Sequence, residues 1–310
     1  MANRKSREEI RYHLTGPNAT IRTPFLRDGS IDYNGLCQLI DFIIAAGSRS
    51  VILTIGDSLF SLLSDEEIAD VTRVTVEHTA GRAMVVAADK YYWTGKAVEF
   101  AQYAQSLGAD VVMVSPPDWG ASATFETHAT HYAAVADEIP VMVVTDVFRR
   151  RSTEFALGTV KRLVDSVDNI VAVKDDLVGE FGRRLCLMVH DRWAVYSGGL
   201  KQNHLDVVPY GCDGYLSTFI TFQPSVAQDY WKAIETKDMD GVRKILHEIE
   251  LPFWDFLHTV PGAGVGKDGA IHAIYELYGI TERWRRNPYH NLNDQEMEKL
   301  AGFLKSKSLL

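Results

Sequence analysis

The most reactive side chain in the sequence is a lysine at the end of an apolar run. Lys174 follows Ile170-Val-Ala-Val173, a stretch typical of a buried strand. A free lysine amine has a pKa of about 10.4 and is not nucleophilic while protonated, but burial favours its neutral form. A neutral amine can attack the carbonyl of a keto acid and form an imine. The imine withdraws electrons from the next carbon, which permits carbon–carbon bond formation or cleavage, or loss of water, without a metal.

The neighbours of Lys174 favour a different interpretation. Asp175 and Asp176 follow directly, and nearby carboxylates stabilise the charged ammonium. The lysine would then be an ion-paired or phosphate-binding residue. The two interpretations predict different surroundings, because catalysis requires an uncharged amine in an apolar cage and ion pairing requires an amine locked against an acid.

Polar residues after another apolar run could bind a carboxylate. Thr54 offers a hydroxyl, and the turn from Ile55 through Gly56 to Asp57 offers backbone N–H groups that a ligand could approach closely. An ordinary turn explains the same residues. Arg150 could pair with a second carboxylate, although a triple arginine is also typical of a solvated loop.

The sequence gives little support for a metal or phosphate site. The ten histidines fall mostly in predicted helices or connections, and we interpret His128 and His131 as solvated helix residues. We therefore predict no metal. Ser197-Gly198-Gly199 could begin a phosphate-binding loop, but no second glycine turn follows it.

Eight short β-branched runs recur at helix-sized intervals. Several, such as Val111–Val114, are apolar at every position, as in parallel strands buried on both faces. The segments between them carry helix signals, including a capping box from Ser64 to Glu67. Alternating strands and helices fit a doubly wound sheet or a closed barrel, and the count of eight predicts an α/β fold of the (β/α)8 TIM-barrel type. The predicted strands are Ala19–Thr23, Ser50–Thr54, Ala83–Ala88, Asp110–Ser115, Pro140–Thr145, Asn169–Lys174, Trp193–Ser197 and Asp213–Thr218.

Three regions are expected along the chain. Residues 1–13 are predicted to form an exposed N-terminal arm, residues 14–236 the barrel, and residues 237–310 a C-terminal three-helix extension. The extension would contain helices over Asp240–Phe256, Lys267–Tyr278 and Asp294–Lys305.

Composition narrows the classes of partner. Hydrophobic residues make up 46% of the 310 residues, enough for a sizeable core, and the net charge of -9 disfavours nucleic-acid and anionic-membrane binding. The charged N-terminus is not a signal peptide, and no apolar stretch of about 20 residues occurs. The three cysteines have no CxxC spacing, so we predict neither disulfides nor zinc, and a cytoplasmic location.

Several short motifs, taken in order, resemble the dihydrodipicolinate synthase and N-acetylneuraminate lyase family. The resemblance runs from about Gly16 to the C-terminus and includes a Thr-Pro-Phe opening followed by an Asp-Gly-Ser-Ile-Asp turn. Each motif is short, but their joint order is specific. The motifs are Thr23-Pro24-Phe25, Asp28–Asp32, Gly81-Arg82, Gly108–Asp110, Asn169–Lys174, Ser197-Gly198 and Gly211–Gly214.

The resemblance implies a role for each candidate residue. Lys174 would form the imine with a small 2-keto acid such as pyruvate, and no cofactor would be needed. Thr54 and Thr145 would assist catalysis. Homo-oligomers, dimers or tetramers, are also implied. The substrate would contact Ile55, Gly56, Asp57, Trp119, Arg150, Ser197, Gly198 and Leu216.

The sequence also departs from the family pattern. Thr145 stands where the family usually has a proton-relaying tyrosine, and an alcohol is far less acidic than a phenol. A true dihydrodipicolinate synthase is therefore not expected, and Asp57, Asp118, Asp146 or Tyr91 would have to move protons. The expected function is that of an aldolase or dehydratase. The alternative is a catalytically altered barrel that binds a small carboxylic acid.

Overall fold

The strands form one closed parallel barrel in which each strand pairs with the next along the chain. A computed structural model of the protein describes residues 5–261 and 267–310. The barrel closes where β8 pairs with β1, with Gly214 opposite Gly16. The predicted (β/α)8 barrel is thus confirmed. The strands are β1 (Gly16–Thr20), β2 (Ser50–Ile52), β3 (Met84–Ala88), β4 (Val111–Val114), β5 (Val141–Val144), β6 (Ile170–Asp175), β7 (Ala194–Ser197) and β8 (Gly214–Leu216).

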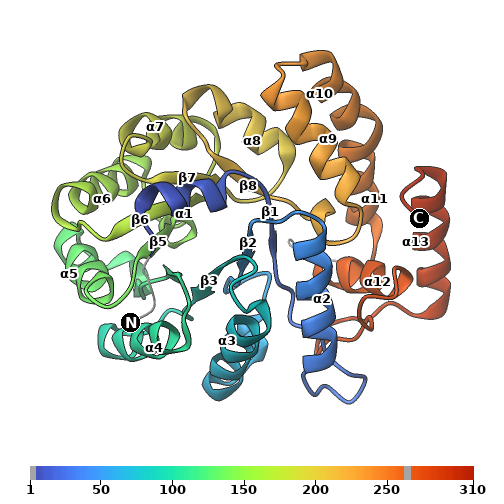
Figure 1. Cartoon of the computed structure of the whole chain (residues 1–310), viewed down its shortest axis with the longest axis horizontal. Helices are drawn as coiled ribbons and strands as arrows, with labels where there is room; N and C mark the ends of the chain where they lie inside the picture. The colour runs from blue at the N-terminus through green and yellow to red at the C-terminus, as the bar shows by residue number, and fades with distance from the viewer. Residues whose placement is uncertain (1–4, 262–266) are drawn as a thin grey trace.

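A ring of helices covers the outside of the barrel (Figure 1). Each strand is followed by one of them, and their apolar faces pack on strands that are buried almost throughout. The helices are α2 (Tyr33–Ala45), α3 (Asp65–Thr79), α4 (Thr94–Leu107), α5 (Phe125–Ala136), α6 (Thr153–Ser166), α7 (Gly179–Val189), α8 (Lys201–Val207) and α9 (Pro224–Glu235). The predicted capping box at Ser64 begins α3 as expected.

The N-terminal residues differ from the exposed arm that we expected. Arg7–Leu14 form helix α1, which begins with a capping box between Ser6 and Glu9. One face of α1 is buried, since Ile10 and Leu14 are fully covered. The alternation of these two apolar residues with charged ones is the amphipathic signal that the expectation overlooked.

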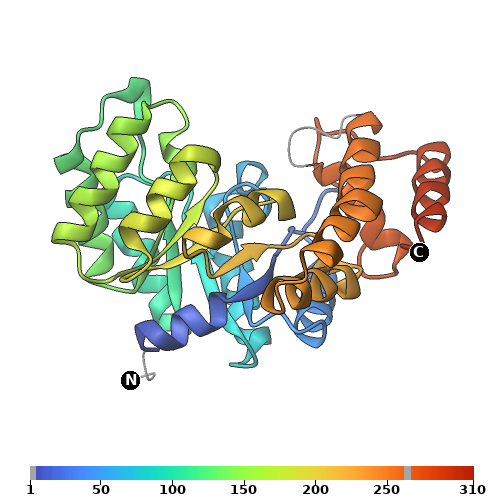
Figure 2. The ribbon, with the colours of Figure 1, turned by 90° about the horizontal axis from the view of Figure 1, so that it is seen from above.

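Helix α1 closes the end of the barrel opposite the carboxyl ends of the strands. Arg11 bonds both Asp213, just before β8, and the carbonyl of Trp193, just before β7. Figure 2 shows α1 beneath the barrel. The opposite end is therefore the one left for a site.

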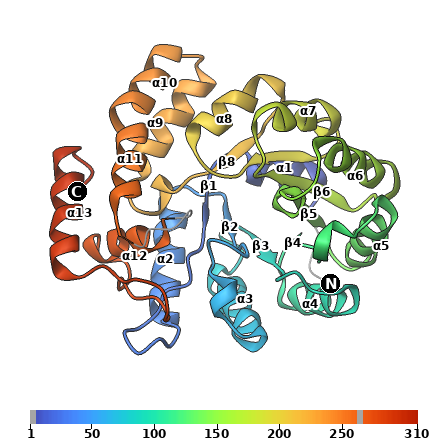
Figure 3. The ribbon, with the colours of Figure 1, turned by 180° about the vertical axis from the view of Figure 1, so that it is seen from behind.

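The C-terminal extension stands beside the barrel, next to α2 and α9 (Figure 3). One continuous helical stretch consists of α10 (Met239–Ile245), a π-helical turn (Leu246–Glu250) and α11 (Leu251–Thr259). It is followed by α12 (Asp268–Leu277) and α13 (Asp294–Ser306). The extension places α11 and the start of α12 at the mouth of the barrel.

Strand β1 ends three residues earlier than predicted. The N–H of Ile21 still bonds Ile52, but the next residues leave the sheet. Arg22 consequently lies just past the carboxyl end of the strand, and its side chain turns toward the mouth of the barrel.

Candidate active site

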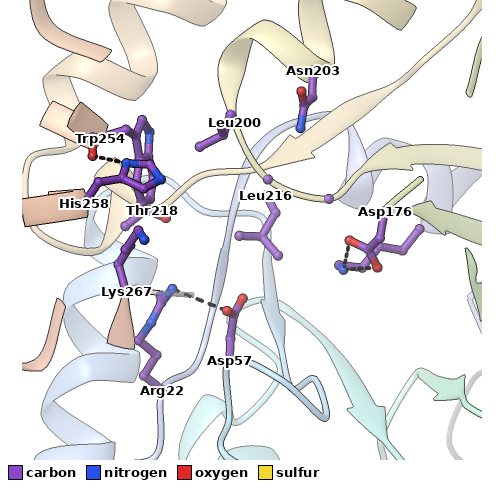
Figure 4. A pocket seen from close by; sticks show the side chains of 13 residues that line it. Arg22, Asp57, Asp176, Leu200, Asn203, Leu216, Thr218, Trp254, His258 and Lys267 are labelled. Atoms are coloured by element: carbon purple, nitrogen blue, oxygen red, sulfur yellow. Dashed lines mark hydrogen bonds and ion pairs between the residues drawn. The ribbon is translucent and has the colours of Figure 1, made fainter. Parts of the chain in front are cut away.

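A cavity of about 340 Å³ lies at the carboxyl ends of the strands, where barrels hold their reactive groups. Its volume falls within the usual range of small-molecule sites. Barrel loops and the C-terminal extension both contribute to its wall (Figure 4). The wall is formed by Arg22, Asp57, Lys174, Asp176, Gly198, Gly199, Leu200, Asn203, Leu216, Thr218, Trp254, His258 and Lys267.

Lys174 reaches this cavity from β6. The side chain of Lys174 is only 10% exposed, and its Nζ donates to both carboxylate oxygens of Asp176, at 2.5 and 2.6 Å. The expected apolar cage is therefore wrong in one respect: the amine faces the cavity, but an acid contacts it. The ion pair that the two neighbouring carboxylates suggested is thus present, and it is formed with Asp176.

Gly198 makes room for the pair of Lys174 and Asp176. A Cβ atom at Gly198 would overlap the carboxylate of Asp176 and lie 2.9 Å from Nζ of Lys174. A side chain at this position would have to displace the ends of both charged side chains. Gly198, a predicted substrate contact, thus lies in the cavity wall beside Lys174.

Thr145 lies behind the pair and outside the cavity wall. It is fully buried, its hydroxyl donates to Asp175 at 3.0 Å, and the same oxygen accepts the N–H of Asp176 at 2.8 Å. Burial raises the pKa of Asp175, while N–H donors after β6 and the Thr145 hydroxyl oppose that rise. Thr145 therefore holds the loop that carries Asp176 and is not itself a residue of the cavity wall.

The loop after β2, which was predicted to bind a carboxylate, is held by hydrogen bonds within the loop and to β1. The Thr54 hydroxyl accepts the N–H of Asp57, and the Asp57 carboxylate accepts the hydroxyl of Thr20 at 2.9 Å. Ile55 packs against the core, and a Cβ at Gly56 would contact nothing within 4 Å. Of these four residues, Asp57 is the one in the cavity wall.

Two other predicted contacts lie at the ends of neighbouring strands. Leu216, at the end of β8, forms part of the wall. Ser197, at the end of β7, is buried, and its hydroxyl has no hydrogen-bond partner within residues 5–261 and 267–310. Ser197 thus lies beside the wall residue Gly198 with an unused donor.

Trp119 and Arg150 do not reach the cavity. The Trp119 side chain is 89% exposed after β4, and Arg150 lies on the surface after β5. The flanking arginines have structural partners, since Arg149 pairs with Asp146 and Arg151 pairs with Asp118. The arginine run is therefore mainly a loop anchor.

Residues that the sequence did not single out complete the wall. Arg22 carried a visible signal, because it places a charge inside the apolar run Ala19–Thr23. Trp254 and His258 are four residues apart on α11, so they share one helix face. Asn203 and Lys267 carried no local signal, because their approach to the barrel depends on tertiary packing.

His128 and His131 are buried, contrary to the solvated positions that we expected. His128 packs against the rings of Phe148 and Phe155, and His131 bonds the hydroxyl of Thr94. Burial lowers the pKa of both, to about 4 for His131. In the part of the chain that the structure describes, no three His, Cys, Asp or Glu side chains are grouped to hold a metal ion.

Fold and site together define a TIM barrel with a lysine at the end of its sixth strand, facing a cavity with acids on its wall. A family model described as the dihydrodipicolinate synthetase family matches residues 13–307. The chain therefore belongs to this family, and the resemblance inferred from short motifs is confirmed.

Individual relatives have more than one function. A 4-hydroxy-tetrahydrodipicolinate synthase from Psychrobacter sp. (strain PRwf-1) is 30% identical, with both chains covered completely. A protein from Saccharopolyspora erythraea named "Probable 5-dehydro-4-deoxyglucarate dehydratase" is 28% identical over 92% of this chain and 91% of the relative. The crystal structure of N-acetylneuraminate lyase from Mycoplasma synoviae matches with a TM-score of 0.78 and 21% identity, covering 96% of this chain and 99% of that one.

These relatives establish the function at the level of the family. The chain is an enzyme of a lyase family whose members include synthases and dehydratases. No helix within the described residues combines the length and the apolar character needed to cross a membrane.

Proposed function

We propose that the protein is a lyase, an aldolase or a dehydratase, that acts on pyruvate or another 2-keto acid through an imine with Lys174. The position of Lys174 in the cavity wall, at the carboxyl end of β6, is the observation that carries this proposal. It places the amine beside the substrate, and Asp176 is there to accept its proton. The imine itself accepts electrons, so the reaction needs no cofactor.

Asp176 would move the protons of imine formation. It takes one proton from the ammonium of Lys174, Nζ adds to the keto carbon, and Asp176 returns that proton to the former keto oxygen. Asp176 then carries a second proton from the nitrogen to the same oxygen. That oxygen leaves as water, so an ammonium and a ketone give an iminium ion and one water with no change in charge. Such proton transfer by a positioned side chain typically contributes about 10²–10⁴-fold to the rate.

The same carboxylate is within reach of the next step. The carbon that loses its proton is two bonds from Nζ, and Asp176 contacts Nζ directly. Asp176 would thus take the role of the family's proton-relaying tyrosine, whose position is occupied by Thr145 in this sequence. Because no tyrosine lies in the cavity wall formed by residues 5–261 and 267–310, we do not propose dihydrodipicolinate synthase activity.

The test follows two readouts with pyruvate. Borohydride should trap a covalent adduct at Lys174, and the methyl protons of pyruvate should exchange with deuterium from D2O. Lys174→Ala should abolish both. Asp176→Asn should still allow the adduct but slow the exchange by about 10²-fold or more.

Asp191→Asn, which removes an exposed carboxylate, is the matched control and should change neither readout. Loss of the adduct with unchanged exchange, or normal exchange in Asp176→Asn, would contradict the role of Asp176. An absence of both signals with pyruvate and with longer 2-keto acids would favour the alternative, a barrel that only binds a small acid. The tight ion pair of Lys174 is the observation that favours this alternative.

We also propose that the protein is a homo-oligomer. Trp93 and Trp119, after the adjacent strands β3 and β4, are 65% and 89% exposed, and large exposed aromatic surfaces often mark interfaces. Sedimentation of Trp93→Ser/Trp119→Ser should then show a smaller mass than the wild-type chain. Leu187→Ser, on α7, is the control, and a monomeric wild-type chain would refute the proposal.

Free thiols at Cys37, Cys186 and Cys212 support a reducing, cytoplasmic location.

A further inference from the structure

The wall of the cavity opposite Asp176 has no part in the proposed imine chemistry. In Figure 4, Trp254 and His258 lie on one side of the cavity and Asp176 lies on the other. Leu216 lies between the two sides. Trp254 and His258 both come from α11, in the C-terminal extension. A substrate that reacts at Lys174 and extends across the cavity therefore approaches this helix.

The π-helical turn Leu246–Glu250 orients the residues of α11. A single π-helical turn adds about one residue to the helix, so the side chains that follow are rotated by about 100° around the helix axis. Such turns occur frequently at functional sites. Trp254 and His258 follow this turn four residues apart, so they share the helix face that lines the cavity.

A buried carboxylate holds Trp254 in place. Glu250 is the last residue of the π-helical turn, and its Oε1 accepts the indole N–H of Trp254 at 3.0 Å. The same oxygen accepts the backbone N–H of Lys201 at 3.1 Å, and Oε2 accepts Nζ of Lys201 at 2.6 Å. Leu200, the neighbour of Lys201, lines the cavity as well. One acid therefore ties α11 to the loop after β7.

The hydrogen bond of His258 assigns the proton of its ring. Nδ1 of His258 lies 2.6 Å from the backbone carbonyl oxygen of Trp254, one turn earlier in α11. A carbonyl oxygen only accepts hydrogen bonds, so Nδ1 carries the proton of the neutral ring and donates to that oxygen. Nε2 then has a lone pair and no proton. Because His258 is exposed and lines the cavity, Nε2 offers an acceptor to a ligand there.

We propose that His258 is a substrate-binding residue, and that its Nε2 accepts a hydrogen bond from a hydroxyl group of the substrate at the end of the cavity away from Lys174. This inference rests on the proposed function, because it places the keto carbon at Lys174. It assigns selection of the rest of the substrate to α11. A ring that only capped the end of α11 would use Nδ1 in the same way but would not discriminate among substrates.

The experiment compares keto acids that differ in one terminal group. Borohydride trapping is titrated with 7-hydroxy-2-oxoheptanoate, 7-methoxy-2-oxoheptanoate and 2-oxoheptanoate, and with the three acids that are one carbon longer. In the wild-type chain, the hydroxy acid of at least one length should half-saturate trapping at a concentration about threefold to tenfold lower than the unsubstituted acid, the usual net size of one hydrogen bond. The methoxy acid cannot donate a hydrogen bond and should show no such gain.

Two variants of His258 test the acceptor itself. His258→Phe removes both ring nitrogens and should bring the ratio between the hydroxy and the unsubstituted acid close to one. His258→Gln places an amide oxygen near the position of Nε2 and should keep part of the preference. The matched control is His247→Phe, which replaces an exposed histidine of the π-helical turn and should keep the wild-type ratio.

Three results would overturn the proposal. They are a wild-type ratio near one at both chain lengths, an equal gain for the methoxy acid, and an unchanged ratio in His258→Phe. Circular dichroism checks that each variant is folded. Nitrogen-15 NMR of the wild-type chain, which shows which ring nitrogen carries the proton, decides the case if His258→Phe does not fold. A neutral ring of His258 protonated at Nε2 would refute the proposal, and one protonated at Nδ1 would support it.

Failure of the imine is separable from failure of this contact. If no keto acid is trapped, the proposed function is wrong, and calorimetry then measures binding of the same hydroxy acids to Lys174→Ala and to Lys174→Ala/His258→Phe. Tighter binding to Lys174→Ala would support the contact with His258. Equal binding to both variants, or no binding to either, would rule the contact out.

Discussion

The reactivity of Lys174 depends on which neighbour holds its proton. In an extended chain, residues i and i+2 point to the same side, so Asp176 follows Lys174 toward the cavity while Asp175 points to Thr145 behind the strand. The sequence therefore contained the information that separates the two acids. It could not show which acid pairs with Lys174, because that depends on how closely Asp176 approaches Nζ.

Gly198 offers a direct test of that close approach. Gly198→Ala would force the carboxylate of Asp176 and Nζ of Lys174 apart, since a Cβ atom overlaps the first and lies 2.9 Å from the second. Displacements of about 1 Å at reacting groups can cost about 10²-fold in rate. We expect borohydride trapping with pyruvate to slow by about this factor, measured as the rate of adduct formation by mass spectrometry.

The control for this substitution is Gly302→Ala on α13, where a Cβ atom would contact nothing within 4 Å. It should trap pyruvate at the wild-type rate. Equal rates in Gly198→Ala and the wild-type chain would mean that the pair moves aside at no cost, and that Gly198 has no steric role.

At the scale of elements, periodicity predicted most of the fold, and contacts between distant segments account for what it missed. The predicted helix Pro224–Glu235 is α9, and Asp294–Lys305 differs from α13 by one residue. Helix α1 was missed because its few apolar residues are spread among charges. The π-helical turn Leu246–Glu250 was also missed; its last residue, Glu250, forms a buried bond with Lys201 of α8, more than forty residues away in sequence.

That buried bond joins the extension to the barrel. Lys201, at the start of α8, and Glu250 are each 2% exposed, with Nζ and Oε2 2.6 Å apart. Burial lowers the pKa of Lys201, and Glu250 opposes that shift. The other oxygen of Glu250 accepts the indole N–H of Trp254 at 3.0 Å, so the same acid positions a residue of the cavity wall.

Removing the acid should therefore destabilise the protein strongly. In Glu250→Gln the ammonium of Lys201 stays buried without its counter-ion, a change that typically costs about 3–5 kcal/mol. Lys201→Met/Glu250→Leu removes both charges and should recover most of this loss. Urea denaturation of each variant measures the free energy of unfolding.

The exposed pair Lys161 and Asp165 provides the comparison, because Lys161→Met should cost no more than about 1 kcal/mol. A loss of that small size in Glu250→Gln would show that solvent reaches the pair and that it does not join the two parts.

At the scale of the whole molecule, the site combines parts of the chain that local sequence cannot relate. The predicted barrel fold indicated the end at which functional side chains should lie. Lys174, Asp57, Gly198 and Leu216 do line the cavity at that end. Arg22 and Lys267 line the same cavity because the start of α12 packs beside the residues that follow β1. Local sequence patterns cannot predict such packing between the first and last parts of a chain.

Buried titratable groups make the stability of the protein depend on pH in two opposite directions. Burial lowers the pKa of His131 to about 4 and of His204 and His272 to about 3. Below a pH of about 6.5 the unfolded chain binds protons that these folded histidines do not, so stability falls as the pH falls. Asp89 acts in the opposite direction, because burial raises its pKa from 3.8 to about 7.

The contribution of Asp89 can be isolated with Asp89→Asn. Between about pH 4 and pH 7 the unfolded wild-type chain releases this proton while the folded chain keeps it, so the wild-type chain loses stability as the pH rises. The variant has no such proton, and its Oδ1 can still accept the N–H of Ser115, as Asp89 does at 2.8 Å. Its stability relative to the wild-type chain should therefore rise by about 3 kcal/mol from about pH 5 to about pH 8, since two units of the shifted range lie in that interval at about 1.4 kcal/mol each.

Urea denaturation at both pH values and one protein concentration measures this change, with the exposed Asp240→Asn as the control that should show none. A difference between Asp89→Asn and the wild-type chain that stays constant across the two pH values would mean that Asp89 is already ionised in the folded barrel.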